Sequence, residues 1–146
     1  LEQALQANQA YADEYRVHWQ LLAVPESANV LVDAQRFLQV MANLLSNAAK
    51  HSPANSAVEI HCQVSGQQLR IEVRDYGSGI PEAFRTRIFS KFAQADSSDR
   101  RQLGGTGLGL AISRELVERM HGQIGFNCEQ GHGTCFWFSL PMASPP

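Results

Sequence analysis

The sequence feature that most constrains the fold is the stretch LGGTGLGLAIS, which runs from Leu103 to Ser113. Its four glycines lie within six consecutive positions and are followed directly by an apolar pattern with helical spacing. Glycine allows positive φ angles and lets a bound group approach the main chain closely. A helix that begins behind such a loop points its unpaired N–H groups and its positive dipole end toward that group. The stretch therefore predicts a loop-to-helix junction suited to phosphate, with a flexible capped loop as the alternative.

Two familiar phosphate-binding loops do not match this stretch. A P-loop places a lysine directly after its last glycine, whereas here Gly109 is followed by Leu110. A dinucleotide-binding loop follows a β-strand, but residues 93–102, which read AQADSSDRRQ, are polar and have no strand pattern. The glycine-rich stretch therefore requires another kind of nucleotide site, for which the rest of the chain has to supply the other residues.

The overall composition is that of one globular domain. A chain of 146 residues can bury a substantial core, and its net charge of −2, without a basic stripe, argues against nucleic acid as the main partner. No apolar run reaches the length of about 18 residues that a membrane-spanning helix needs, and no signal peptide is visible. We therefore expect no membrane contact by this domain and a cytoplasmic location, within a parent protein that other segments can anchor in the inner membrane. The three cysteines lack CxxC spacing, and we expect them to be buried thiols.

Hydrophobic periodicity predicts a mixture of strands and helices. Residues 34–50 form the strongest helical pattern, and residues 58–64 and 69–73 alternate as the two strands of a hairpin. The remaining elements are predicted as helices at 1–14, from Pro81 and around 108–120, and as strands at 17–22, 29–32, 123–128 and 134–140. Because hairpins interrupt the alternation of strands and helices, we predict a two-layer α/β (α+β) sandwich with the helices on one face of the sheet.

One face of the predicted 34–50 helix carries two carboxamides, Asn43 and Asn47, one turn apart, with Lys50 close by. Mg²⁺ prefers oxygen ligands and commonly bridges substrate phosphates while it keeps several waters. An asparagine oxygen suits such an ion when the phosphates already supply negative charge, and Lys50 can neutralise phosphate oxygens. These residues predict a magnesium-phosphate site, with a solvent-exposed polar stripe as the alternative.

An acidic residue ends the second strand of the predicted hairpin. Asp75 follows residues 69–73 and precedes Gly77 and Gly79. A carboxylate in this position can accept a hydrogen bond from the amino group of adenine, whereas guanine has an oxygen acceptor at the same ring position. The glycines would let a base lie against the main chain. The alternative is that Asp75 only begins a turn.

The segment between Phe89 and Gly104 has the composition of a lid. Phe89 and Phe92 provide apolar anchors. Arg100 and Arg101 provide positive charge ahead of the glycines. Segments longer than about 12 residues without secondary structure are uncommon unless they act as lids or linkers. We therefore predict a lid over the site, with an ordinary exposed loop as the alternative.

The order of these features is more specific than any one of them. A helix with two asparagines, an acidic turn with glycines, a lid anchored by phenylalanines, a glycine-rich loop and a final Gly131-His132-Gly133-Thr134 follow one another. From about Tyr15 to Leu140, the chain resembles the ATP-binding catalytic domain of bacterial sensor histidine kinases. The segment FAQADSSDRRQLGGTGLGLAISRELVERMHGQI is most similar to kinases of the hybrid type. These kinases belong to the GHKL superfamily, which also contains the ATPases of type II topoisomerases, mismatch repair and heat-shock chaperones.

This resemblance implies a Bergerat-type fold, in which a mixed sheet of about five strands carries three helices on one face. It implies that residues 16–142 form the catalytic domain and that residues 143–146 are a frayed tail. Residues 1–15 would be the C-terminal end of a preceding helical dimerisation or phosphoacceptor domain, or a linker. The resemblance also implies ATP and Mg²⁺ as cofactors, bound between the helices and the lid.

The resemblance further implies which residues surround the nucleotide. Asn47 would bind Mg²⁺, and Asn43 would form a hydrogen bond near the γ-phosphate or its water. Lys50 and His51 would contact phosphates, although many relatives carry an aromatic residue where His51 stands. Asn43 and Lys50 would be the catalytic residues, and Asp75 would bind the adenine amino group. The full set implied to bind ATP comprises Asn43, Asn47, Lys50, His51, Asp75, Gly77, Gly79, Ile80, Phe92, Arg101, Gly105, Thr106, Gly107, Leu108, Gly109, Leu110 and Thr134.

By the same resemblance, the chain donates the γ-phosphoryl group of ATP to a histidine in two-component signalling. None of its five histidines lies in the acceptor motif, which resembles His-Glu-hydrophobe-Arg-Thr-Pro. The expected partners are therefore a separate dimerisation domain that carries the acceptor and, downstream, a response-regulator receiver domain. Three alternatives stay open: an ATPase of the superfamily, a serine kinase, and a non-catalytic nucleotide-binding docking module. A fast ATPase would need a glutamate at Asn43 to activate water, because asparagine cannot take that proton.

Overall fold

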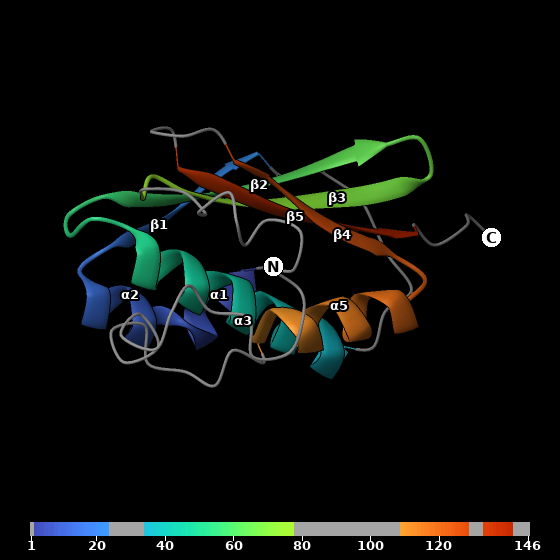
Figure 1. The fold of residues 1–146 in the computed structure, drawn as a ribbon, viewed down its shortest axis with the longest axis horizontal. Helices are drawn as coiled ribbons and strands as arrows, with labels where there is room; N and C mark the ends of the chain where they lie inside the picture. Colours follow the sequence, from blue (N-terminus) through green and yellow to red (C-terminus); the bar gives the residue numbers. More distant parts are fainter. Residues whose placement is uncertain (1, 24–33, 78–108, 129–132, 142–146) are drawn as a thin grey trace.

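Two layers make up the structure, a computed structural model that describes residues 2–23, 34–77, 109–128 and 133–141. A sheet forms one layer, and the described helices all lie against the same face of it (Figure 1). The elements in chain order are α1 (Glu2–Ala7), α2 (Gln9–Tyr15), β1 (His18–Ala23), α3 (Ala34–His51), β2 (Ala57–Ser65), β3 (Gln68–Asp75), α5 (Gly109–Arg119), β4 (Gln123–Cys128) and β5 (Thr134–Pro141). The predicted two-layer sandwich with its helices on one face is confirmed.

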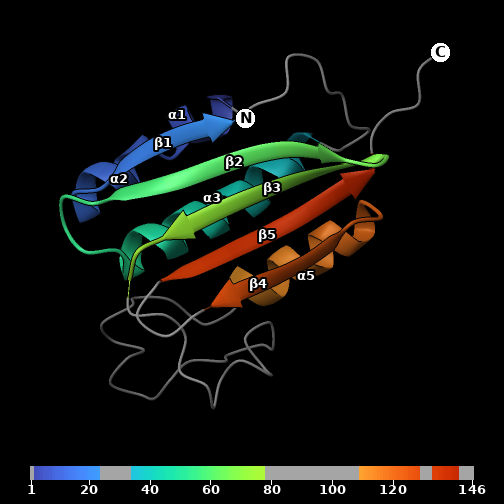
Figure 2. The same ribbon diagram turned by 90° about the horizontal axis from the view of Figure 1, so that it is seen from above.

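The sheet has five strands in the order β1-β2-β3-β5-β4, which Figure 2 shows from above. Strand β1 pairs with β2 in parallel, and the other neighbouring strands are antiparallel, so the sheet is mixed, as predicted. The predicted hairpin is formed by β2 and β3, with Gly66 in its turn at a φ of 63°. The register of β3 on β5 places Asp75, the last residue of β3, opposite Thr134, the first residue of β5.

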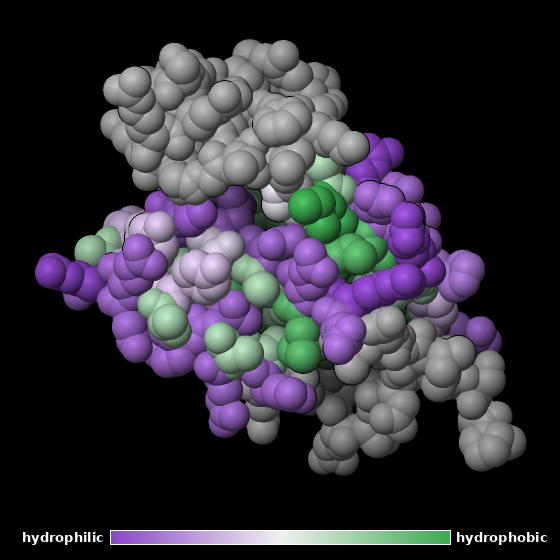
Figure 3. Space-filling model, turned by 90° about the horizontal axis from the view of Figure 1, so that it is seen from below, coloured by the Kyte–Doolittle hydropathy of each residue, from purple (hydrophilic) through white to green (hydrophobic). Residues whose placement is uncertain are grey.

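One face of the sheet and the apolar face of α3 form the core. Alternate strand residues point toward the helices, and Ile60, Ile71 and Phe138 are almost completely buried there. Helix α3 contributes Met41 and Leu44, which have no exposed surface. Figure 3 views the helical layer, where hydrophilic residues cover much of the described surface beside a smaller apolar patch, as amphipathic helices require. This packing holds α3, which carries the two asparagines, against the sheet in which β3 ends at Asp75.

The N-terminal segment forms two helices where one was predicted at 1–14. The amide of the Asn8 side chain donates a 2.8 Å hydrogen bond to the carbonyl of Ala4, while its main-chain N–H bonds to Leu5 instead. The side chain thus takes the place of the helical main-chain bond, and α1 ends. Ala4 and Ala12 have no exposed surface and lie in the same core as α3. Helices α1 and α2 therefore pack against the rest of the domain, and the assignment of residues 1–15 to a preceding domain stays a prediction.

Some of the other predicted elements lie within the described residues, and others do not. The helix and strands expected from residue 108 onward are α5, β4 and β5. The strand predicted at 29–32, the helix from Pro81 and the predicted lid lie outside the described residues. Cys62 is a buried free thiol and Cys135 a half-buried one. Among the described residues, no helix combines the length and the hydrophobicity that a membrane-spanning segment requires.

Candidate functional site

The carboxyl group of Asp75 is buried at the end of β3, and only 1% of the residue is exposed. Its Oδ1 atom accepts a 2.9 Å hydrogen bond from the main-chain N–H of Gly77. Burial raises the pKa of Asp75 to about 6, against the opposing effects of main-chain hydrogen bonds from Gly77 and Thr134 and of the positive charge of Arg74. The result is a desolvated acceptor, held in position by the main chain, that is ionised at neutral pH.

Two glycines allow main chains to approach each other closely around Asp75. A Cβ atom on Gly77 would lie 2.0 Å from the carbonyl oxygen of His51, at the end of α3. A Cβ atom on Gly133 would lie 2.1 Å from the carbonyl oxygen of Asp75, and the φ of Gly133 is +80°. Side chains cannot be accommodated at either position without movement of the main chain. The turn after β3, the end of α3 and the start of β5 therefore meet at Asp75.

A second group of contacts joins α3 to the first turn of α5. The Nδ2 atom of Asn43 lies 3.2 Å from the carbonyl oxygen of Gly109 and 3.1 Å from the Oγ atom of Ser113. The hydroxyl of Ser113, which has no exposed surface, donates a 2.8 Å hydrogen bond to the same Gly109 carbonyl. These bonds attach the helix that carries the asparagines to the last glycine of the glycine-rich stretch.

Three more residues of the predicted site lie on α3 between Asn43 and the end of the helix. Asn47 and Lys50 are half-buried, and His51 is exposed at the helix end. Desolvation by surrounding protein atoms, and then the positive charge of Lys50, lower the pKa of His51. A histidine with a lowered pKa is neutral at pH 7, so the positive charge of α3 at this end comes from Lys50. A neutral His51 ring can still donate or accept a hydrogen bond.

The structure thus brings several predicted residues together along α3. Asn43 contacts Gly109, and the main chain of His51 lies against Gly77, which binds Asp75. Asn43 and His51 are separated on α3 by a rise of about 12 Å, at 1.5 Å per residue. Leu110 is half-buried and packs against the core. The predicted site residues that lie outside the described part are Gly79, Ile80, Phe92, Arg101, Gly105, Thr106, Gly107 and Leu108.

The sequence pattern assigned no role to Ser113, although this residue ends the glycine-rich stretch. A signal was present, because Ser113 follows Gly109 by four residues and therefore lies on the same face of the helix. A serine in this position can bond to the carbonyl one turn earlier. Its contact with Asn43 depends on how α3 packs against α5, which the spacing within one helix does not reveal.

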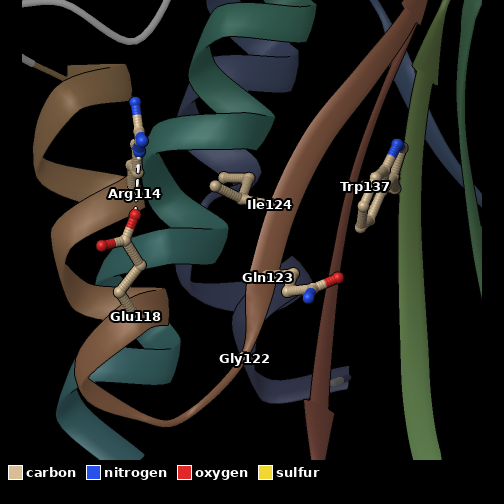
Figure 4. A pocket seen from close by; sticks show the side chains of 6 residues that line it. All are labelled: Arg114, Glu118, Gly122, Gln123, Ile124 and Trp137. Atoms are coloured by element: carbon tan, nitrogen blue, oxygen red, sulfur yellow. Dashed lines mark hydrogen bonds and ion pairs between the residues drawn. The ribbon is translucent and has the colours of Figure 1, made fainter.

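A separate shallow hollow of about 510 Å³ lies at the other end of α5, between this helix and the edge strand β4 (Figure 4). Arg114 and Glu118, on exposed turns of α5, form an ion pair of 2.8 Å at its rim. Ile124 of the edge strand β4 and Trp137 of the neighbouring strand β5 line it. None of the predicted site residues contributes to this hollow. Among the described residues there is also no group of three or more His, Cys, Asp or Glu that could hold a metal ion.

Comparison with known proteins yields a match over most of the chain. Residues 32–144 match the family model described as histidine kinase-, DNA gyrase B-, and HSP90-like ATPase. The sensor histidine kinase AruS of Pseudomonas aeruginosa is 46% identical over 115 residues, which are 75% of this chain and 12% of that protein. The signal transduction histidine-protein kinase BarA of Escherichia coli is 38% identical over 123 residues, which are 81% of this chain and 13% of BarA.

A solved structure supports the same relationship. The crystal structure of full-length ShkA in complex with AMPPNP superposes with a TM-score of 0.83 and 31% identity. The superposition covers 99% of this chain and 29% of that one. The chain thus spans less than a third of ShkA and less than a fifth of AruS or BarA.

Proposed function

This chain belongs to the family of histidine kinase-, DNA gyrase B- and HSP90-like ATPases, and we propose that it binds Mg-ATP and donates the γ-phosphoryl group to a histidine of a separate helical domain. The observation that carries the proposal is the direct contact between Asn43 of α3 and Gly109 of α5. This contact joins the helix with both asparagines to the glycine-rich stretch, as a phosphate site built from the two would require. The similarity to sensor histidine kinases supports a histidine as the acceptor.

We propose that Asp75 accepts a hydrogen bond from the adenine amino group. Its carboxyl group is buried and accepts hydrogen bonds from main-chain donors. A carboxylate can accept more than two hydrogen bonds. In a site that excludes water, each added donor stabilises the ionised form. Gly77 and Thr134, which adjoin Asp75, would shape the base pocket together with Gly79 and Ile80, which lie outside the described residues.

We propose that Asn47 binds Mg²⁺ and that Lys50 contacts phosphate oxygens. The donor set fits this ion when phosphates are present, because carboxamide oxygens are hard but uncharged ligands and the phosphates supply the negative charge. When bound, the ion would offset the negative charge of the phosphates. Gly109 and Leu110 would border the phosphates at the start of α5. The phosphate and lid residues proposed from outside the described part are Phe92, Arg101, Gly105, Thr106, Gly107 and Leu108.

The role proposed for Asn43 is to position the γ-phosphate end of the nucleotide. Its carboxamide can accept and donate hydrogen bonds, but it cannot take a proton from water as a glutamate would. Phosphoryl transfer depends mainly on positioning and on neutralisation of charge. We therefore expect slow hydrolysis of ATP by the chain alone and transfer that depends on the acceptor domain.

Titration with a non-hydrolysable ATP analogue, with and without Mg²⁺, tests the binding part of the proposal. The unaltered chain should bind the analogue more tightly when Mg²⁺ is present, and Asn47→Ala should remove this gain. Gln39→Ala is the matched control, because Gln39 is exposed on the same polar face of α3, and it should keep the gain. Failure of the unaltered chain to bind the analogue in excess Mg²⁺ would reject the proposal.

Incubation with γ-radiolabelled ATP and the acceptor-bearing helical domain of a sensor histidine kinase relative tests the transfer. The expected product is acid-labile, alkali-stable label on the histidine of the added domain and none on the histidines of this chain. Acid-stable label on serine would favour a serine kinase. Rapid phosphate release without the acceptor would favour an ATPase, and binding without transfer would favour a docking module.

A further inference from the structure

We propose that Ser113 is a positioning residue, which turns the carboxamide oxygen of Asn43, rather than its amino group, toward the nucleotide. This inference rests on the proposed function, because it concerns how that site presents Asn43. Ser113 is not among the residues predicted from the sequence to bind ATP. It acts through Asn43 and has no surface of its own open to a ligand.

The direction of the hydrogen bonds determines which end of the carboxamide faces the protein. The carbonyl oxygen of Gly109 can only accept, so the Asn43 atom 3.2 Å away must be the amino nitrogen. The single proton of the Ser113 hydroxyl is already donated to the same carbonyl at 2.8 Å. Toward Asn43 the hydroxyl therefore presents a lone pair, and it accepts from the same nitrogen at 3.1 Å.

Both acceptors thus hold the amino group of Asn43 against α5, and the oxygen is left on the other side of the carboxamide. A rotation that exchanged the two ends would bring the oxygen against two acceptors and would lose both hydrogen bonds. Without the Ser113 hydroxyl, the Gly109 carbonyl alone would hold the orientation.

Gly109 adds a steric part to the same arrangement. A Cβ atom at this position would have the Cγ and Oδ1 atoms of Asn43 as its nearest neighbours, both at 3.9 Å. The φ of Gly109 is outside the left-handed range, so the main-chain conformation does not by itself require glycine. Because Gly109 has no side chain, the described part of α5 places no methyl group beside the Asn43 oxygen. An oriented carboxamide oxygen suits a hydrogen bond from a magnesium-bound water at the phosphate end of the nucleotide.

The test compares Ser113→Ala with Ser113→Thr, which keeps the hydroxyl. In Ser113→Ala, we expect the gain in affinity for the ATP analogue on addition of Mg²⁺ to fall roughly three- to tenfold, with affinity in the absence of Mg²⁺ nearly unchanged. Ser113→Thr should keep the gain. Ser139→Ala is the matched control, because Ser139 is also a buried serine, with 5% exposed, at the opposite end of β5 from Asp75. It should behave as the unaltered chain.

A spectroscopic measurement separates orientation from stability. The side-chain amide protons of Asn43, assigned by their loss in Asn43→Ala, should shift and exchange faster with water in Ser113→Ala, but not in Ser139→Ala. In the unaltered chain they should stay protected when the Mg²⁺ complex of the analogue binds, because the amino group faces α5. This last measurement is made on the unaltered chain and needs no substitution of Ser113.

The possible outcomes separate this inference from the proposed function. If the unaltered chain does not bind the analogue, the proposed function fails. If it binds, and Ser113→Ala keeps the full Mg²⁺-dependent gain, the positioning role is refuted while the function stands. Equal losses with and without Mg²⁺, accompanied by a lower melting temperature, would also refute it, since they indicate only a structural role. If a folded Ser113→Thr loses the Mg²⁺-dependent gain in affinity, the hydroxyl is not what positions Asn43, and the inference is refuted.

Discussion

The two parts of the proposed site, one around Asp75 and one around Asn43, are held by different kinds of interaction. Around Asp75, main-chain interactions fix the geometry. They are the register of β3 on β5, the hydrogen bond from the N–H of Gly77 and the close approach of Gly77 to the main chain of His51. Around Asn43, side-chain hydrogen bonds connect two helices. The first arrangement can change only if whole elements move, whereas the second can change by rotation of one carboxamide.

This difference has consequences for binding. The Asp75 part is expected to have its final shape before the nucleotide arrives, and preorganised groups bind without a cost of ordering. It should therefore contribute equally to every adenine nucleotide. The Asn43 part lies next to the glycine-rich stretch and is expected to matter only when phosphates and Mg²⁺ are present. Substitutions in the two parts should accordingly differ in size and in their dependence on Mg²⁺.

The largest effect is expected from Gly77→Ala. The added Cβ would lie 2.0 Å from the carbonyl oxygen of His51, and this clash is with main chain that side-chain rotation cannot relieve. Overpacking typically costs about 1–3 kcal/mol, and more where the main chain has to move. We expect a loss of about 3 kcal/mol in the free energy of unfolding, measured by urea denaturation, with weaker binding of both ADP and the ATP analogue. Unchanged stability would show that α3 and the turn after β3 are not rigidly joined.

The pH dependence of stability should report the burial of Asp75. Its folded-state pKa of about 6 lies above its ordinary value of 3.8, so the folded state binds the proton more tightly than the unfolded state. The resulting stabilisation is present below about pH 4 and is lost as the pH rises through 6, in total up to roughly 3 kcal/mol. The neutral variant Asp75→Asn should lack this loss and should be more stable than the unaltered chain at pH 7. The measurement is the difference in urea stability between the two proteins from pH 4 to 7, and a constant difference would contradict the prediction.

The same Asp75→Asn substitution should weaken nucleotide binding while it stabilises the fold. Loss of a buried, charge-assisted hydrogen bond costs about 1–3 kcal/mol, or roughly five- to 150-fold in Kd. The loss should be equal for ADP and for the ATP analogue, with or without Mg²⁺, because the adenine is common to all. In the unaltered chain, affinity should fall as the pH is lowered through 6 and the carboxylate gains a proton. Asp13→Asn, at an exposed carboxylate of α2, is the control, and an Asp75 variant that binds as well as this control would remove Asp75 from the site.

The elements that sequence reasoning predicted best are those with strong local patterns. The amphipathic helix at 34–50 and the hairpin at 58–73 each carry their own periodicity, so α3, β2 and β3 follow without knowledge of the rest of the fold. The break at Asn8 was missed, because it depends on a side-chain bond to Ala4 that competes with the helix. A pattern of alanine and glutamine over 1–14 does not show which of the two bonds is made.

The candidate site was only partly accessible to the same reasoning, for a related physical reason. The chemistry of Asp75 and of the asparagines can be read from their residue types and their positions in predicted elements. Their supporting contacts join residues far apart in the chain: Gly77 with His51, and Asn43 with Ser113. Such contacts depend on how the layers pack, and a serine within a helix has no pattern that distinguishes support from exposure. The residues that hold the site are thus harder to predict than those proposed to contact the ligand.

The smallest effect is expected from Gly109→Ala, which matches Gly77→Ala in chemistry but lies in the Asn43 part. Its Cβ would meet the Asn43 carboxamide at 3.9 Å, an ordinary contact distance, and its φ does not require glycine. Gly109 is the first residue of α5, where the preference of a helix interior for alanine has little effect, so urea denaturation should show nearly equal stability. Binding of the ATP analogue should weaken by roughly threefold or less, and only with Mg²⁺, because the methyl group stands beside the Asn43 oxygen. A loss of stability as large as that of Gly77→Ala would mean that the junction of α3 and α5 is as rigid as the Asp75 part, and the distinction between the two parts would fail.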